Sequence, residues 1–98
     1  MMIRHIFIAA VKEGVSEEII REIAKKLREL KEKYPTVRAG ENLGWYANNT
    51  HVALTADFAD KKSWEAFVNS PEHAAIAKDS MKYYDPDLIF ASQFELEE

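Results

Sequence analysis

The sequence predicts an α+β fold in which a four-stranded antiparallel sheet carries helices on one face. Three segments of the chain have the alternating or continuous apolar pattern of strands, and a fourth is a weaker strand candidate. Two further segments have helical spacing, and the order along the chain is strand, helix, strand, strand, helix, strand. At 98 residues, 47% hydrophobic and 31% charged, the chain is expected to form one domain over residues 1–98 around one core.

The first strand is expected over residues 3–11, an almost unbroken apolar run that only Arg4 and His5 interrupt. A helix follows over residues 16–34, where apolar side chains recur at helical spacing and charged side chains occupy the opposite face. Pro35 ends this helix because the residue before a proline resists helical backbone angles.

The second and third strands are expected to form a hairpin. The second covers residues 37–46 and is expected to be bent or bulged, because it contains two glycines. A turn is expected at Asn48 and Asn49. Residues 51–58 then alternate strictly, which makes this the most clearly defined strand.

The second helical region is expected over residues 60–83 and consists of two pieces. Asp60 caps the first piece, and Ser70 is a good N-cap for the second. Pro71 suits the first helical position, where an amide donor would be unpaired anyway. His73 is therefore expected in the first turn of a short helix.

The last strand is expected over residues 88–96, after a break at residues 85–87, and both it and the first strand are apolar on both faces. In this ferredoxin-like order the helices cover one face of the sheet only. Another copy of the chain is the simplest cover for the second face, so we expect a homodimer packed sheet to sheet, with a larger assembly left open. Alternation places four side chains in this interface: Ile6, Ile8, Val52 and Leu54.

Composition excludes several classes of function. The chain has no cysteine, which removes disulfides, thiolate nucleophiles, iron–sulfur clusters and most structural zinc. Its net charge is -4, its basic residues are interleaved with acidic ones, and no apolar run approaches the roughly 18 residues of a membrane span. We therefore expect no nucleic-acid partner, no membrane partner and, without a signal-type N-terminal segment, a cytoplasmic location.

The three histidines are the candidate catalytic residues. His5 and His51 begin strands that are adjacent in this topology, and His73 can reach the same space if both point toward the helices. Neutral, partly desolvated imidazoles can exchange protons near pH 7. A structural role at strand ends is the alternative for the first two. Three histidines could also bind a metal, but no carboxylate lies at clear ligand spacing, so neither a metal nor another cofactor is expected.

A ligand pocket is expected between the sheet and the helices, where small side chains face one another and leave room. Strand alternation places Phe7, Ala9, Ala53 and Thr55 on the histidine side of the sheet. The small Ala24 of the first helix is expected to line the pocket with Phe7, Ala9 and Ala53. A filled space is the alternative, with Trp45, Trp64 or Phe67 as the filling side chain.

Three motifs on these elements resemble the stress-responsive A/B barrel family, often called Dabb proteins. They are Met2-Ile3-Arg4-His5-Ile6-Phe7-Ile8, Thr50-His51 and Ser70-Pro71-Glu72-His73. The resemblance covers essentially the whole chain and implies one stress-responsive A/B barrel domain that forms a dimeric α+β barrel. It implies no single activity, because the family includes stress proteins and plant polyketide cyclases resembling olivetolic acid cyclase.

The cyclase branch of this resemblance supplies a mechanism. Its pocket histidines match His5, His51 and His73, and the last acts as the acid/base. Its two pocket tyrosines match Phe67 and Leu27, which adds these two residues to those expected to line the pocket. Because both hydroxyls are missing here, we expect olivetolic-type cyclisation to be absent or very weak.

Three classes of function remain open. The first is a homodimer that binds a small apolar or aromatic ligand between sheet and helices. The second is a proton-transfer enzyme, cyclase-like or isomerase-like, with His73 as the base. The third is a structural stress-response protein without catalysis. A binder or an enzyme is favoured, since three inward histidines are a costly way to build an inert core.

Overall fold

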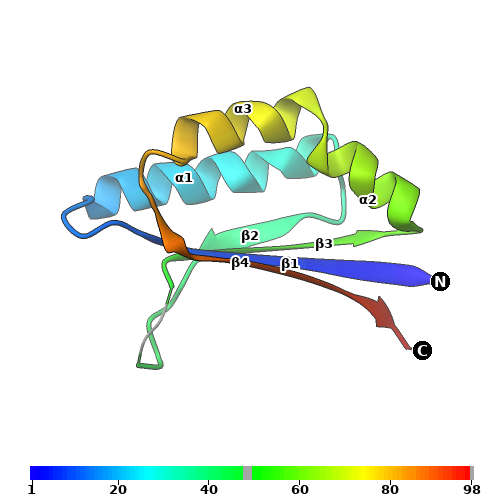
Figure 1. Cartoon of the computed structure of the whole chain (residues 1–98), viewed down its shortest axis with the longest axis horizontal. Helices are drawn as coiled ribbons and strands as arrows, with labels where there is room; N and C mark the ends of the chain where they lie inside the picture. Colours follow the sequence, from blue (N-terminus) through cyan, green and yellow to red (C-terminus); the bar gives the residue numbers. More distant parts are fainter. Residues whose placement is uncertain (48–49, 98) are drawn as a thin grey trace.

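Four strands form one antiparallel sheet, and the α-helices lie together on one of its faces (Figure 1). The computed structural model describes residues 1–47 and 50–97, so the turn expected at Asn48 and Asn49 lies outside the described residues. The strand order is β2-β3-β1-β4, which confirms the predicted α+β fold class. In chain order the elements are β1 (Met2–Val11), α1 (Glu17–Glu29), the 3₁₀ helix η1 (Leu30–Glu32), β2 (Arg38–Glu41), β3 (Val52–Phe58), α2 (Lys61–Val68), α3 (Pro71–Ser80) and β4 (Tyr84–Leu96).

The first helix forms where the sequence predicts it and is shorter than predicted. Ser16 caps α1, because its Oγ accepts a hydrogen bond from the backbone N–H of Ile19. The helix buries four side chains against the sheet: Ile20, Ile23, Ala24 and Leu27. Its α-helical part ends at Glu29, and the tighter 3₁₀ turn of η1 then leads the chain toward Pro35.

Strand β2 is much shorter than the predicted segment 37–46. It ends at Glu41, because the Asn42 side chain accepts a hydrogen bond from the Gly44 N–H at 2.7 Å and turns the chain out of the sheet. Gly44 has φ of 75°, a left-handed conformation that favours glycine. The following loop projects away from the helices, and Trp45 on it is 87% exposed (Figure 1).

Strand β4 begins earlier than the predicted segment 88–96. Tyr84 pairs with Val11 and Ile89 with Ala9, so the chain between these two residues bulges out of register. Pro86 lies in this bulge on an edge strand. Proline has no backbone N–H, and at this place in the sheet no hydrogen bond of the ladder is lost. The residues expected to break the chain therefore lie inside the strand.

The structure corrects the predicted faces of β3. Cross-strand partners in an antiparallel pair point to the same side, and Phe7 pairs with Leu54 while Ile8 pairs with Ala53. Leu54 therefore faces the helices with Phe7, and Ala53 lies on the open face with Ile8. The prediction was wrong for all four alternating positions of β3, which had been assigned from His51: Val52 and Leu54 are core residues, and Ala53 and Thr55 are on the open face.

The open face of the sheet carries apolar side chains that the helices do not cover. Phe90 pairs with Ile8, Phe94 pairs with Arg4, and the two phenylalanines are 47% and 45% exposed. On the same face the Arg4 guanidinium makes two hydrogen bonds to the Asp57 carboxylate, at 2.8 and 3.0 Å. The pair is thus neutral overall on a mostly apolar surface.

Two ion pairs connect the helix that carries His73 to α1 and to the end of η1. Lys33 Nζ lies 3.1 Å from Glu72 in the first turn of α3, and Lys26 Nζ lies 3.6 Å from Asp79 near its end. These contacts help to fix α3 over the sheet. No helix in the described part of the chain is both long and apolar enough to cross a membrane.

Candidate ligand-binding site

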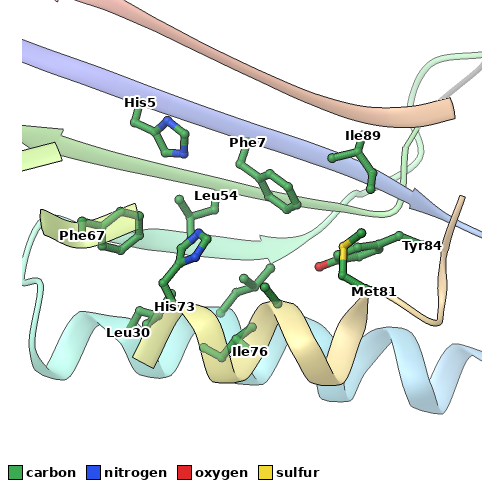
Figure 2. Close-up of a pocket in the computed structure, with 12 residues that line it drawn as sticks. His5, Phe7, Leu30, Leu54, Phe67, His73, Ile76, Met81, Tyr84 and Ile89 are labelled. Carbon is green, nitrogen blue, oxygen red and sulfur yellow. The ribbon is translucent and has the colours of Figure 1, made fainter. Parts of the chain in front are cut away.

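A cavity of about 160 Å³ lies between the sheet and the helix layer. Figure 2 shows its lining side chains, which come from three strands, from α2 and α3 and from α1 with η1. Most of the lining is apolar, and the polar groups that reach it are the two imidazoles and the Tyr84 hydroxyl. The apolar part of the wall includes Phe7, Leu27, Leu54, Phe67, Ile76 and Ile89.

His5 enters the cavity from the central strand β1 and is 6% exposed. Its Nδ1 accepts a hydrogen bond from the indole Nε1–H of Trp64 at 3.3 Å, and the Gln93 side-chain nitrogen lies 3.0 Å from the same atom. The ring also lies against Phe67, with centroids 6.2 Å apart. These three contacts come from α2 and β4, on two sides of β1 in the fold, and leave the His5 ring little freedom.

His73 enters the cavity from the first turn of α3. Ser70 positions this turn, because its Oγ accepts the His73 backbone N–H at 3.2 Å and donates to the Phe67 carbonyl at 2.7 Å. The half-buried His73 ring points toward the sheet and His5 points toward the helices, so the two project into the same space (Figure 2). Within residues 1–47 and 50–97, no hydrogen-bond partner faces the ring nitrogens of His73.

Burial sets the charge state of both imidazoles. Loss of solvent lowers the pKa of His5, and the nearby His73 lowers the pKa further. Loss of solvent also lowers the pKa of His73. Both rings are therefore neutral at pH 7, and each can accept or donate a proton within the cavity.

Tyr84 supplies a phenol that sequence reasoning missed. Burial raises the pKa of its hydroxyl, and a hydrogen bond with Ser80 offsets part of that rise, so the hydroxyl stays protonated. The residue belongs to the bulged start of β4, where alternation does not predict which side a residue faces. Gln93 was also missed, although it lies on the same strand face as Ile89 and Ala91, which was a usable signal that its amide faces the helix side of the sheet.

The structure brings two of the three predicted histidines together. His51 lies outside the cavity, just before β3, where its Nδ1 accepts the backbone N–H of Val11 at 3.0 Å. The backbone N–H of His51 donates to the Ala9 carbonyl at 2.8 Å. The expectation that His51 joins the site was therefore wrong, and its contacts match the structural alternative.

Only some of the residues predicted to bind a ligand lie at this cavity. Phe7, Leu27 and Phe67 line the cavity. Ala9 and Ala24 are fully buried in the core away from it, and Ala53 lies on the opposite face of the sheet. The small side chains predicted to leave room are thus not the ones that surround the space.

The cavity is open, which decides between the two alternatives for this space. Trp45 lies on the exposed loop after β2, Trp64 contacts His5 at the side, and Phe67 forms part of the wall. In the described residues, no three His, Cys, Asp or Glu side chains are grouped so that they could hold a metal ion.

The fold and the cavity define a small ferredoxin-like α+β protein with an apolar site between its two layers. The sequence profile of the stress responsive A/B barrel domain, Dabb, matches residues 3–95. The chain therefore belongs to the Dabb family, as its motifs had indicated. A comparison with curated proteins gave no match.

Solved structures share this fold over nearly the whole chain. A dimeric ferredoxin-like protein of unknown function from Thermobifida fusca is 25% identical, with a TM-score of 0.85 and coverage of 98% of this chain and 92% of that one. The hydroxynitrile lyase of Passiflora edulis is 21% identical, with a TM-score of 0.78 and coverage of 99% and 94%. A Dabb protein from Mesorhizobium loti is 14% identical, with a TM-score of 0.75 and coverage of 99% and 98%.

Proposed function

We propose that the protein binds a small apolar or aromatic molecule in the cavity between its sheet and its helices. The observation that carries this proposal is an open, mostly apolar space of about 160 Å³ into which two neutral imidazoles project. An apolar cavity of about 150 Å³ accommodates a benzene-sized molecule. The size favours a ligand with a single ring, and the imidazoles favour one that carries a polar substituent.

We also propose that the protein is a homodimer in which the open faces of two sheets pack together. The exposed phenylalanines of β4 and the adjoining isoleucines of β1 make a large apolar surface that a second copy would cover. The Thermobifida fusca neighbour, 25% identical, is described as dimeric, which supports a dimer here. In this arrangement each subunit keeps its own cavity on the helix side.

Ligand binding is tested by thermal unfolding with a panel of single-ring compounds, namely benzene, phenol, benzaldehyde and acetophenone. A ligand that binds only the folded state raises the free energy of unfolding by about 2.7 kcal/mol at 100 times its Kd. We expect at least one compound to raise the melting temperature in a saturable way. No saturable shift with any of the four would contradict the proposal.

A matched pair of variants ties any such shift to the cavity. Ala77 lines the cavity on α3, and Ala77→Leu should fill part of the space and abolish the shift. Ala75 is exposed on the same helix, so Ala75→Leu should leave the shift unchanged. Equal shifts in both variants would place the ligand elsewhere on the protein.

Proton transfer on a carbonyl compound is a second candidate function. The observation that favours it is the His73 ring, which is neutral and has no hydrogen-bond partner in the described part of the chain, so it is free to act as a base. The structural neighbour from Passiflora edulis is a hydroxynitrile lyase, so this fold supports an enzyme of small molecules in that protein. The missing hydroxyls at Phe67 and Leu27 argue against olivetolic-type cyclisation in particular.

Hydrogen exchange in a model ketone tests this second candidate without knowledge of the natural substrate. Acetophenone in D2O loses its acidic α-protons slowly, and a positioned base accelerates the exchange, which mass spectrometry follows. We expect exchange above the buffer rate with the parent protein and none with His73→Ala. The same rate with both proteins would remove proton transfer at His73 from consideration.

A further inference from the structure

We infer that Trp64 and Gln93 hold His5 in the tautomer protonated at Nε2, which makes it a fixed hydrogen-bond donor in the cavity and selects ligands with an acceptor oxygen, such as ketones. The selection step rests on the ligand-binding function proposed above, and the tautomer itself does not. Trp64 and Gln93 are positioning residues here, because they act through His5 and do not line the cavity.

The hydrogen bonds at Nδ1 decide where the proton resides. In a neutral imidazole one nitrogen carries the proton and donates, and the other accepts. An indole N–H can only donate, and that of Trp64 lies 3.3 Å from Nδ1 of His5. Nδ1 must therefore be the accepting nitrogen, which places the proton on Nε2.

Gln93 provides a second contact to the same nitrogen of His5. Its side-chain amide can turn either its oxygen or its nitrogen toward His5, and the Trp64 contact decides in favour of the nitrogen, which lies 3.0 Å from Nδ1. Gln93 lies directly opposite His5 in the β1–β4 ladder, so the register of the sheet fixes its place. Two donors thus converge on one acceptor.

The same contacts oppose protonation of His5. An imidazolium carries a proton on both nitrogens, and its Nδ1–H would face both the Trp64 N–H and the Gln93 amide. This acts in the same direction as burial, which already lowers the pKa of His5. A positively charged His5 able to attract an anionic ligand is therefore disfavoured, and a neutral donor is favoured.

The free side of His5 faces the cavity. Figure 2 shows the ring of His5 directed from β1 toward the helix layer, and in the described residues no group of the protein accepts a hydrogen bond from its Nε2. A ligand acceptor is then the partner that this donor lacks. His73 has no such contacts on its ring, so the two histidines differ: His5 is committed to donating and His73 is not.

The tautomer can be measured in the free protein by long-range ¹H–¹⁵N NMR of the imidazoles at about pH 8, above the pKa of ordinary histidine. His51 is an internal reference, because the Val11 N–H donates to its Nδ1 and fixes the same tautomer. We expect His5 and His51 each to show a single Nε2–H form, and His73 to show a mixture. A mixture or an Nδ1–H form at His5 would overturn the inference.

Three substitutions test the cause. Trp64→Phe combined with Gln93→Leu removes both donors and should give His5 a mixed tautomer like that of His73. Trp45→Phe, at a tryptophan that is 87% exposed on the loop after β2, should leave the His5 resonances unchanged. If the double variant does not fold, each single variant should still show part of the change.

Gln93→Glu tests the opposite direction. A carboxylate beside Nδ1 accepts a hydrogen bond where the amide donates one, and its negative charge stabilises the imidazolium, so this variant should raise the pKa of His5. Gln93 is an exposed residue, which makes the variant tolerable for the fold. An NMR titration that finds the same His5 pKa in Gln93→Glu as in the parent would show that Gln93 does not position His5.

The ligand step uses acetophenone and α-methylstyrene, which share one shape and differ in a carbonyl oxygen against a methylene group. We expect acetophenone to bind about fivefold more tightly by thermal shift titration, and the Trp64→Phe, Gln93→Leu double variant to reduce this preference. Equal affinities in the parent protein would overturn the selection even if NMR confirms the tautomer. Binding of neither compound would contradict the proposed ligand class, while the NMR result would still decide the tautomer.

Discussion

The phenyl ring of Phe67 packs edge-on against the imidazole of His73, with ring centroids 5.2 Å apart and an angle of 73° between the ring planes. The same phenyl ring contacts His5 at 6.2 Å, so one fully buried side chain from α2 touches both histidines of the cavity. The spacing between the two imidazoles therefore depends on how α2 packs against the sheet.

His73→Ala should impair ligand binding much more than stability. The helix cap does not need the imidazole, because Ser70 accepts the backbone N–H of residue 73, which alanine retains. Loss of the ring contact with Phe67 should cost about 1 kcal/mol in the free energy of unfolding. Urea unfolding should therefore resemble that of the parent, while the affinity for a ligand that shifts the parent falls at least tenfold. An early-unfolding variant with normal binding would make His73 a packing residue.

Phe67→Ala should lower the stability of the fold much more than His73→Ala does. Its ring is fully buried and contacts the rings of Tyr34 and Phe58 in addition to both histidines. Truncation of a buried phenylalanine typically costs about 3–5 kcal/mol, because a cavity remains. We expect a large drop in the urea midpoint, measured by circular dichroism. A loss below about 1 kcal/mol would show that α2 packs more loosely than the structure indicates.

Stability should fall as the pH drops through the ordinary histidine range. The folded-state pKa values of His5 and His73 are lowered from 6.5, the value expected in the unfolded chain. At a pH between the folded and the unfolded pKa of either histidine, the unfolded chain therefore binds more protons than the folded one. Their contribution is constant above about pH 6.5 and decreases below it until the folded pKa values are passed. Urea titrations at fixed protein concentration from pH 8 downward measure this slope.

One control variant and the pKa values of the carboxylates separate the histidine contribution from others. His73→Gln removes one of the two groups and should give a shallower slope than the parent. The pKa values of Asp57, Asp60 and Glu72 are lowered from 3.8, 3.8 and 4.5, so their contributions are lost at lower pH and do not overlap with this window. A parent slope that is flat from pH 8 to 5 would contradict the prediction.

Two glutamate substitutions on opposite faces of the sheet should have different effects. Ile8 lies on the open face beside Phe90, so Ile8→Glu should weaken the proposed dimer and leave the subunit folded. Leu54 is 3% exposed and faces the helices, so Leu54→Glu should unfold the subunit itself. Sedimentation and circular dichroism separate the two outcomes. A parent protein that sediments as a monomer would contradict the dimer, whatever the variants do.

Local signals in the sequence were enough to predict the fold. The caps at Ser16 and Ser70 act within a few residues, so the sequence shows them directly, whereas the first helix ends at Glu29, before the predicted stop at Pro35. No local signal shows which residues of β3 face the helices. The faces were assigned on the assumption that His51 points at the helices, but that residue precedes the strand and bonds to the backbone of β1. Only the pairing of Leu54 with Phe7 fixes the faces.

The site was predictable only where a single element positions its residue. His73 follows from its helix start, and His5 from the alternation of β1. Tyr84 depends on a bulge, and the contacts of His5 with Trp64 and Gln93 join three elements far apart in the sequence. Such contacts depend on tertiary packing, which no periodicity in one segment reports.

The ion pair of Arg4 and Asp57 gives the open face a particular sensitivity. Each side chain cancels the charge of the other within one subunit, so a partner copy needs no countercharge of its own. In a two-fold symmetric dimer any residue on this face occurs twice. Asp57→Asn would leave one uncompensated guanidinium on each sheet, and the two like charges would face a shared interface. A single change in the sequence would thus introduce a repulsion that both subunits experience at once.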